Sequence, residues 1–301
     1  MTRDRAGGGT ALGQPPARPQ PGVIPADAMA AKAAAENFPV ALRVLPRRYR
    51  GYLMAVYAFA RTVDDIGDEA PPEQRPRLLA DLREDLQRLY AAQPGSRPAH
   101  PVVRGLAGAV TDCAIPMRPF RDLIAANEQD QVVSRYQTFD DLLGYCRLSA
   151  NPVGQLVLYV FGCYTPERAE LSDAVCSALQ VVEHLQDVAE DFRAGRIYVP
   201  LDDLQSHGCT EQDLAAPSAS PELRRVVAAE AGRAAALLAA GSPLVGQLRG
   251  AARIAVAGYL AGGRAALRAL ARARYDVLAS SPRPSRGGTA VAFVGALVRG
   301  R

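Results

Sequence analysis

The 301-residue sequence contains no tryptophan, and tyrosine and phenylalanine bring its aromatic content to only 6%. Its three histidines, His100, His184 and His207, lack the spacing of metal ligands, so they predict no zinc site. Five cysteines form an odd set without a C-x-x-C pair, and most of them lie in apolar segments. These absences argue against a disulfide framework and favour reduced thiols in a cytoplasmic protein.

Long apolar runs are also missing. No uninterrupted apolar stretch reaches roughly 18 residues, so we predict no membrane span. The charged N-terminus has no apolar segment behind it, and we expect no secretory signal. No alternating apolar run with hairpin turns occurs, which argues against a sheet. The P-loop and the G-x-G-x-x-G pattern of nicotinamide-binding folds are absent too. With a net charge of +4 and arginines scattered among acids, the chain has no basic stripe for nucleic acid.

What the chain does contain favours helices. Hydrophobic residues make up 49% of it, and the most frequent types include alanine, leucine and arginine, which form helices at low entropic cost. We predict an all-α, single-domain helical bundle over residues 28–280, with helices near 221–240 and 250–279. Residues 1–27 are rich in glycine and proline and predict a disordered tail. Residues 281–301 form a tail whose short apolar segment either packs on the body or contacts a membrane surface.

Two predicted helices each carry a line of polar side chains. Pro46 is placed to open a helix that runs to about Gly67, with breaks expected at later prolines such as Pro119. A second long helix is predicted from about Pro166 to Phe192, because its apolar residues recur at the helical period. The polar lines are Tyr57, Arg61, Asp64 and Asp68 on the first helix, and Gln180, Glu183, His184, Asp187 and Asp191 on the second.

The two lines share one chemical feature, a pair of aspartates at D-x-x-x-D spacing. A single pair of this kind is usually a solvated helix face, but like charges at this spacing repel and call for a cation. Carboxylates without histidine or cysteine partners suit Mg²⁺, which keeps several waters and is completed by substrate phosphates. Arg61 and Arg196 are candidate anion ligands. Nearby tyrosines either offer ring faces to a carbocation or are half-buried core residues; they are Tyr57, Tyr145, Tyr198 and Tyr259.

Together these motifs resemble the squalene/phytoene synthase family over about residues 33–280. The resemblance is carried by Y-x-x-x-R-x-x-D-D-x-x-D from Tyr57, by Q-x-x-x-x-x-x-D-x-x-x-D from Gln180, and by the G-R-I-Y-V-P segment from Gly195. It implies an all-α prenyl-diphosphate enzyme with a central cavity and two or three Mg²⁺ ions held by the four aspartates. It further implies diphosphate binding by Arg61, Gln180, Arg196, Tyr198 and Asn37, catalytic roles for Tyr57, Tyr145 and Asn151, and cavity positions for Phe38, Gly154 and Tyr259.

Departures from the family pattern narrow the expected reaction. The chain has Glu36-Asn37-Phe38-Pro39-Val40 in place of a serine-rich phosphate segment, Glu183 where many members have asparagine, and Gln186 in place of a frequent basic residue. The N-F-P-V and S-A-N-P-V-G segments are similar to hydroxysqualene synthases of bacterial hopanoid pathways. This similarity implies conversion of presqualene diphosphate and water to hydroxysqualene, with no requirement for NADPH. Asn151 either orients the water or forms a turn and helix cap before Pro152.

Two other functions stay open at this point. One is head-to-head condensation of two farnesyl or geranylgeranyl diphosphates to presqualene diphosphate, squalene or phytoene. The other is a non-catalytic helical subunit that binds prenyl diphosphate. In each case the expected partner is a prenyl diphosphate lipid. Peripheral contact with the inner face of the membrane and contact with other hopanoid-pathway enzymes are open alternatives, and no nucleic acid is expected.

Overall fold

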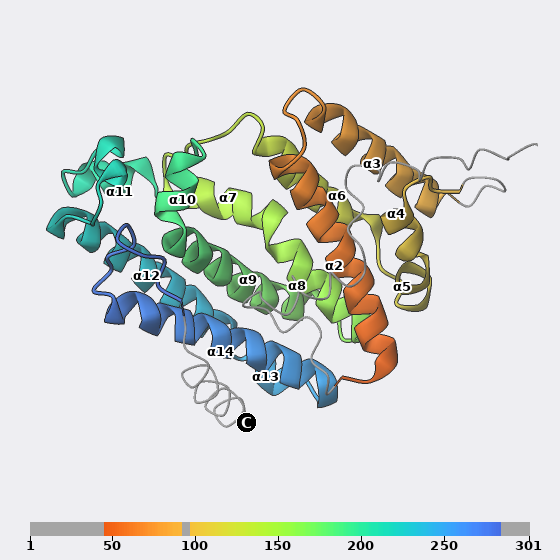
Figure 1. Ribbon diagram of the computed structural model, residues 1–301. Coiled ribbons are helices and arrows are strands. Elements are labelled where there is room, and N and C mark those ends of the chain that lie inside the picture. The colour runs from red at the N-terminus through yellow and green to blue at the C-terminus, as the bar shows by residue number, and fades with distance from the viewer. Residues whose placement is uncertain (1–44, 92–96, 284–301) are drawn as a thin grey trace, which may run out of the picture.

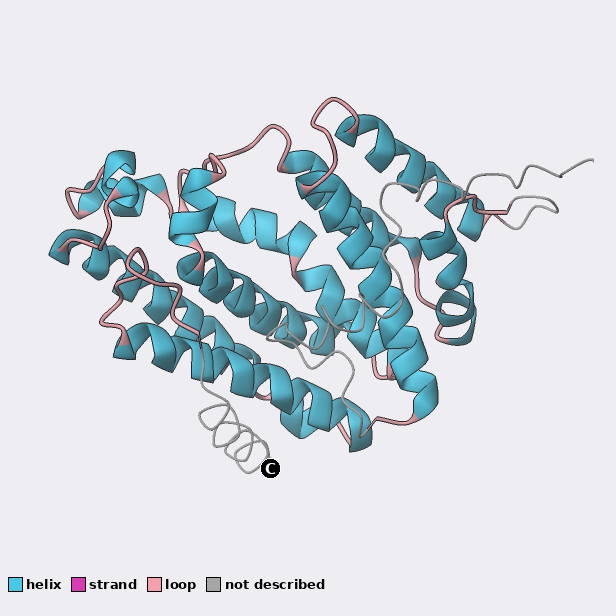
Figure 2. Ribbon diagram, in the orientation of Figure 1, coloured by secondary structure: helices cyan, strands magenta, loops and turns pink. Residues whose placement is uncertain are grey.

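The structure, a computed structural model, is described here for residues 45–91 and 97–283. The predictions about the N-terminal tail, Asn37, Phe38 and the apolar segment near the C-terminus concern residues outside these ranges. Figure 2 shows helices joined by loops throughout the described part of the chain. In these ranges, the only β-type backbone pairing is an isolated parallel bridge between Arg135 and Ile197. The prediction of an all-α fold is confirmed.

The helices follow one another with short connections (Figure 1). In chain order they are α2 (Arg47–Asp68), α3 (Arg75–Tyr90), α4 (Pro101–Gly105), α5 (Ala107–Asp112), α6 (Met117–Gln129), α7 (Phe139–Ser149), α8 (Asn151–Val160), α9 (Pro166–Gln186), α10 (Val188–Arg193), α11 (Leu201–Ser206), a 3₁₀ turn (Glu211–Ala215), α12 (Pro221–Gly241), α13 (Leu244–Gln247) and α14 (Gly250–Arg272).

Helix α2 matches its predicted span closely. Pro46 is the residue that caps it, and the helix continues to Asp68 before Pro71-Pro72 prevents a further turn. Its apolar side, including Phe59 and Val63, is fully buried in a cluster with α3, α6 and α8. The predicted polar line lies on a different face of α2 from this buried apolar side.

The second long helix differs from its prediction, because it ends at Gln186 instead of Phe192. Asp187 has φ −110° and ψ 13°, and its carbonyl accepts the first backbone bonds of α10 from Glu190 and Asp191, both at 2.8 Å. The prediction failed because the apolar stripe continues through Val188 across the break, so periodicity conceals the change of direction. Asp187 and Asp191 therefore do not lie on one continuous helix.

Two smaller predictions also need correction. Pro119 does not break a helix, since it lies in the first turn of α6, where its missing N–H costs no intrahelical bond. The last described helix ends at Arg272, short of the predicted residue 279, and Arg274 and Tyr275 have positive φ angles of 51° and 57°.

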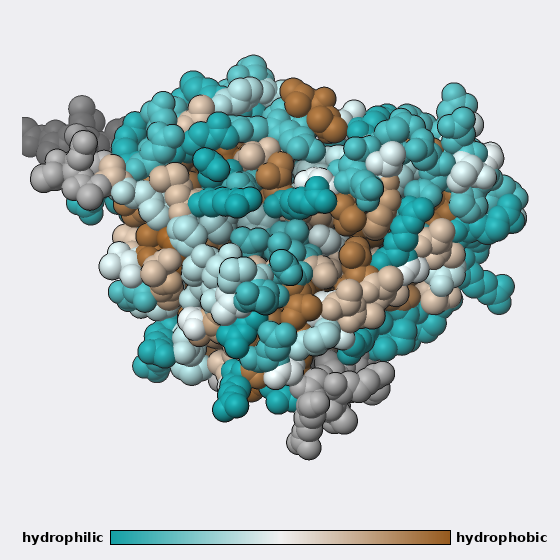
Figure 3. All heavy atoms as spheres, turned by 180° about the vertical axis from the view of Figure 1, so that it is seen from behind, coloured by the Kyte–Doolittle hydropathy of each residue, from teal (hydrophilic) through white to brown (hydrophobic). Residues whose placement is uncertain are grey.

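Helix α9 lies at the centre of the bundle, packed against α8, α12 and α14 (Figure 1). Helix α2 packs on α6 and α8 on the other side of the bundle. The face seen in Figure 3 is mostly polar, with apolar residues in separate patches. In the described ranges, no helix combines the length and apolarity that crossing a membrane requires.

Candidate active site

A cavity of about 850 Å³ lies between the two predicted acidic helices. Its walls come from α2, the α7–α8 junction, α9 and α14, together with one residue of the C-terminal segment. The lining residues are Leu53, Val56, Tyr57, Ala60, Arg61, Asp64, Ser149, Ala150, Val153, Val157, Cys176, Leu179, Gln180, Val182, Glu183, Gln186, Asp187, Tyr259, Gly262, Gly263, Ala266 and Arg283.

The lining changes character along the helices. The earlier turns of α2 and most of α8 supply aliphatic side chains such as Leu53, Val56 and Val157, while the C-terminal turns of α2 and α9 supply Asp64 and Asp187. Ligand sites that are largely apolar with a few converging polar groups hold amphiphilic molecules in one orientation. The cavity is therefore suited to a long hydrocarbon with a polar head group.

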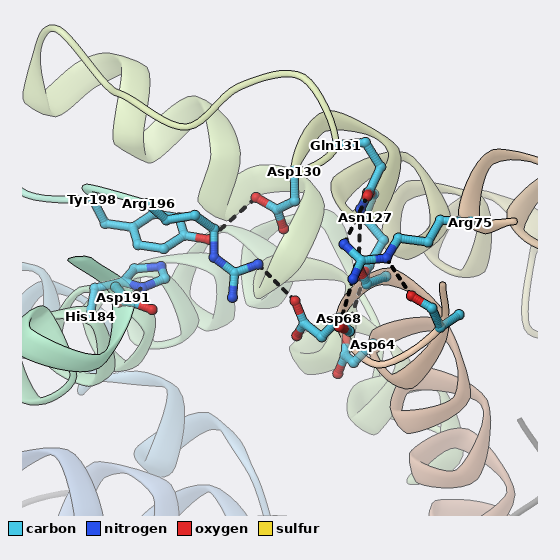
Figure 4. Close-up of polar contacts among 12 residues, drawn as sticks. Asp64, Asp68, Arg75, Asn127, Asp130, Gln131, His184, Asp191, Arg196 and Tyr198 are labelled. Carbon is cyan, nitrogen blue, oxygen red and sulfur yellow. Dashed lines mark hydrogen bonds and ion pairs between the residues drawn. The ribbon is translucent and has the colours of Figure 1, made fainter. Parts of the chain in front are cut away.

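Asp64 stands at the polar end of the cavity. Asn127 of α6 donates a hydrogen bond to its Oδ1 at 3.1 Å (Figure 4). The Asp64 side chain is exposed to the cavity that it lines, and desolvation by the surrounding protein raises the pKa of Asp64 to about 7. The Asn127 bond and the charge of Arg61 act in the opposite direction, while Asp68 and Glu183 raise the pKa further. The effect of Glu183 shows that the acidic lines of α2 and α9 influence each other electrostatically.

Close approach of α6 to α2 depends on Gly67. A Cβ atom at this position would lie 2.1 Å from the Asn127 Oδ1 atom, so any larger residue would displace the asparagine. Two further side chains fix the end of α2: Gln131 donates to the Gly67 carbonyl at 3.3 Å, and Arg75 donates to the Asp68 carbonyl at 2.9 Å (Figure 4). These bonds satisfy carbonyls that a helix end leaves without partners.

The two arginines proposed from the sequence are both held by carboxylates. Arg61 lines the cavity and contacts Asp65 at 2.7 Å and Glu69 at 3.4 Å. Arg196 reaches across from the segment after α10 to contact Asp68 at 2.7 Å (Figure 4). The Arg196 Nε atom is buried without a hydrogen-bond partner among the described residues, so an N–H group stays available for an anion.

Tyr145 and Tyr198 lie beside the cavity, around Asp130, and are not among its lining residues. Tyr145 donates a hydrogen bond to Asp130 at 2.6 Å, and Tyr198 donates to the other carboxylate oxygen at 3.3 Å. Burial raises the pKa of Asp130, while the Tyr145 bond and the charge of Arg196 lower it. The structure thus places both hydroxyls on the Asp130 carboxylate, outside the cavity lining, whereas the family resemblance implied a catalytic role for Tyr145 and diphosphate binding by Tyr198.

The second acidic pair has different surroundings. Asp187 lines the cavity, and its Oδ1 atom contacts Arg283 at 2.8 Å and accepts a hydrogen bond from Ser281 at 3.2 Å. Asp191 lies 3.8 Å from the Nδ1 atom of His184, whose ring stacks on Tyr198 with centroids 3.7 Å apart. His184 therefore joins the second pair to the tyrosines around Asp130.

The other predicted site residues divide into two groups. Tyr57, Gln180 and Tyr259 line the cavity, and Gln180 also lies 3.1 Å from the Nε2 atom of His184. Gly154 and Asn151 do not line it. Gly154 lies against α9, where an added Cβ would meet the Ser172 Oγ atom at 2.4 Å.

Asn151 is buried and accepts a hydrogen bond from Ser177 at 2.9 Å. Its reading as a helix cap is wrong, because the residue that caps α8 is Ala150 and no side chain caps that end. The cavity wall nearest to it in the chain consists of Ser149 and Ala150.

Sequence reasoning missed Asn127, Asp130 and Arg283. Asn127 and Asp130 lie at the end of α6, in a polar stretch that looks like an ordinary solvated helix end. Arg283 belongs to a tail rich in proline and arginine, which carries no periodic signal. The available signal for Asn127 and Asp130 was an apolar run followed directly by amide side chains and an aspartate. No sequence signal indicated Arg283.

The donor chemistry at the polar end fits Mg²⁺. The available ligands are carboxylates, with no cysteine among the cavity's polar residues at this end, and hard oxygen donors are what Mg²⁺ prefers. Within the described ranges, no three acidic, histidine or cysteine side chains are gathered closely enough to form a metal cage.

Comparison with known proteins gives consistent matches. A family model described as squalene/phytoene synthase matches residues 31–288. The hydroxysqualene synthase of Rhodopseudomonas palustris is 36% identical over 215 residues, which cover 71% of this chain and 72% of that relative. The phytoene synthase of Mycobacterium tuberculosis is 35% identical over 178 residues, which cover 59% of this chain and 57% of that relative.

Solved structures show the same arrangement of helices. The crystal structure of squalene synthase HpnC from Alicyclobacillus acidocaldarius matches with a TM-score of 0.75 and 41% identity, covering 83% of this chain and 94% of that one. A dehydrosqualene synthase in complex with ligand matches with a TM-score of 0.77 at 23% identity, covering 91% of this chain and 95% of that one. At this lower identity the likeness concerns the fold alone.

Proposed function

Because the chain belongs to the squalene/phytoene synthase family and is an enzyme of isoprenoid biosynthesis, we propose that it converts presqualene diphosphate and water to hydroxysqualene with release of diphosphate. The observation that carries the proposal is the cavity, whose apolar length ends at carboxylates of two helices flanked by arginines. Three relatives named hydroxysqualene synthase, matched over 67% to 72% of their length, support this choice of reaction.

In this proposal the polar end binds the diphosphate. Asp64, Asp68, Asp187 and Asp191 would hold Mg²⁺, which supplies positive charge to the leaving diphosphate oxygens. Arg61, Arg196 and Gln180 orient the diphosphate by hydrogen bonds, since guanidinium groups match phosphate oxygens in pairs. The contact with Asp68 at 2.7 Å holds the Arg196 guanidinium beside the end of α2.

The apolar end controls the carbocation. Heterolysis of the carbon–oxygen bond leaves the electron pair on diphosphate, and the cyclopropylcarbinyl cation rearranges before water adds and loses a proton. Aliphatic walls from α2 and α8 exclude bulk water, while the Tyr57 and Tyr259 rings face the cation. Asn151, which follows the lining residues Ser149 and Ala150 in the chain, is the proposed residue that orients the attacking water.

The test is product identification with the full chain. Presqualene diphosphate, Mg²⁺ and ¹⁸O-labelled water, without NADPH, should yield hydroxysqualene that carries the label, with one diphosphate released per molecule. Squalene or unlabelled product would contradict the proposal. Binding of presqualene diphosphate without diphosphate release would instead indicate a non-catalytic binding subunit.

Condensation of two prenyl diphosphates is the second candidate. It is favoured by the similarity to a protein titled squalene synthase, at 41% identity, and to phytoene synthases. Incubation with farnesyl or geranylgeranyl diphosphate and Mg²⁺, with and without NADPH, separates the reactions. Presqualene diphosphate, squalene or phytoene as the product would establish condensation.

The remaining proposals concern context. We propose that residues 28–280 form one domain, which the continuous packing of α2 to α14 supports. Peripheral contact with the inner face of a membrane, where an apolar product would collect, stays a proposal, as do a cytoplasmic location and contacts with other enzymes of hopanoid synthesis.

A further inference from the structure

A short segment after α14 lies across the end of α9. The Gln186 side chain donates a hydrogen bond to the Pro282 carbonyl, while Ser281 and Arg283 on either side both contact Asp187 Oδ1, at 3.2 and 2.8 Å. Gln186 is only 1% exposed, so it is a fixed anchor for this segment. The result is a guanidinium held at the polar end of the cavity by a residue 96 positions away in the chain.

Arg283 differs from the other arginines near this site. Arg61 contacts Asp65, and Arg196 contacts Asp68. Arg283 pairs with Asp187 and lines the cavity as Arg61 does, but its side chain is 50% exposed, against 28% for Arg61 and 26% for Arg196. Its charge is therefore positioned at the cavity and accessible to a ligand.

We propose that Arg283 is a diphosphate-binding residue, seated by the bond from Gln186 to the Pro282 carbonyl. This inference rests on the proposed function and deepens it, since it assigns part of the anion site to the C-terminal segment. Asp187 is its partner in the free protein. Asp187 would hold a cation, and the Arg283 guanidinium would then donate to diphosphate oxygens at the same end of the cavity, for which its planar fork is suited.

The alternative is a purely structural latch, in which Arg283 only fastens the C-terminal segment to Asp187. The two roles predict different measurements. A latch changes the stability of the ligand-free protein and is indifferent to diphosphate. A binding residue changes the affinity for diphosphate and leaves the ligand-free protein nearly unchanged, because a half-exposed ion pair contributes little to folding.

The experiment measures binding of inorganic diphosphate to the full chain by calorimetry, in excess Mg²⁺. The parent chain is compared with Arg283→Gln, Arg283→Lys and the control Arg225→Gln, whose arginine is 61% exposed and pairs with Glu222 alone at 2.9 Å among the described residues. We expect Arg283→Gln to weaken binding about 10- to 100-fold, as expected for lost bonds to a charged group. Arg283→Lys should lose less, because it keeps the charge, and Arg225→Gln should match the parent.

A relocated charge provides the second test. Gln186 also lines the cavity, so Gln186→Arg in the Arg283→Gln background should restore part of the diphosphate affinity. Unchanged affinity in Arg283→Gln overturns the inference and leaves the proposed function intact. Equal losses in the Gln and Lys variants, together with a lower thermal midpoint without ligand, indicate the latch and also overturn it. Failure of the parent to bind diphosphate overturns the inference and the proposed site together.

Discussion

The two aspartate pairs have the same spacing in the sequence but different structures. Asp64 and Asp68 lie on the uninterrupted helix α2, whose end is fixed by side chains from α3 and α6. Asp187 and Asp191 lie on either side of a helix break, and their contacts come from the C-terminal segment and from His184. The same sequence spacing therefore places the first pair on one continuous helix and the second pair on either side of a helix break.

The difference suggests a division of labour at the polar end. In the α2 pair, Asp64 is supported by the neutral amide of Asn127, and Asp68 is paired with Arg196, whose side chain is only 26% exposed. Asp187, in contrast, is paired with a half-exposed arginine, a contact that a bound cation can replace. We expect the first pair to define the position of the metal and the second to adjust when ligand binds.

The largest expected effect follows from removing one carboxylate of each pair. Asp64→Asn and Asp187→Asn should each lower turnover of presqualene diphosphate by about 10³-fold or more, because charge stabilisation by a bound metal contributes several kcal/mol. Diphosphate release is the measurement, with helical circular dichroism showing that the fold is kept. An active double variant would rule out the metal assignment for both pairs.

A smaller effect tests the backing of the α2 pair. Asn127→Leu should lower activity about 10- to 100-fold and raise the Mg²⁺ concentration needed for half-maximal rate, because residues that orient metal ligands have effects of this size. Gln131→Ala, two residues beyond the end of α6, is the matched control, since Gln131 bonds backbone carbonyls and leaves Asp64 untouched.

The proposal that Asn127 positions Asp64 can also be tested by a change on α2. Gly67→Ala improves helix propensity by roughly 1 kcal/mol but places a Cβ at 2.1 Å from the Asn127 Oδ1 atom. We expect the single variant to lose activity as Asn127→Leu does. If Gly67→Ala keeps full activity and the Mg²⁺ requirement of the parent, Asn127 does not position Asp64.

The contact between the second pair and its histidine should matter least for activity. His184→Phe keeps a ring to stack on Tyr198 but loses the polar contacts with Asp191 and Gln180, so a loss of roughly 2- to 10-fold is expected, the worth of a single neutral hydrogen bond. Steady-state kinetics with presqualene diphosphate measures it. A loss as large as that of Asn127→Leu would show that both pairs are equally dependent on their supports.

The sequence predicted the structure best where residue types that begin or end helices flank a regular helical pattern of apolar residues. Proline at both ends and a regular apolar side predicted α2 nearly to the residue, and the tyrosine, arginine and aspartates at helical spacing followed from it. The break at Asp187 was missed because Val188 is buried in the structure, as it would also be on one continuous helix, so its apolar side chain does not reveal the break. Asn127 was missed for a different reason: its bond to Asp64 spans 63 residues, so only the packing of α6 on α2 reveals it.

One carboxyl group outside both pairs affects stability and provides a reference for them. Glu230 of α12 is 1% exposed, contacts Arg233 at 2.6 Å, and has one carboxyl oxygen without a hydrogen-bond partner in the described part of the chain. Burial raises the pKa of Glu230 to about 8, and the neighbouring Asp203 raises it further, against the charge of Arg233. Other ionisable groups near this cluster are His207 and Asp140.

The sign of the pH effect follows from the direction of that shift. In the unfolded chain the carboxyl ionises near its usual pKa of about 4.3, so its stabilising contribution is complete below that pH and is lost as the pH rises toward about 8. Glu230→Gln cannot ionise and should gain on the order of 1–3 kcal/mol relative to the parent between pH 5 and pH 8, since Arg233 offsets part of the cost. Thermal unfolding of both proteins at the two pH values measures this gain. If the difference between them does not change with pH, the Glu230 carboxyl ionises in the folded protein as it does in the unfolded chain, and its burial beside Arg233 does not contribute to the pH dependence of stability.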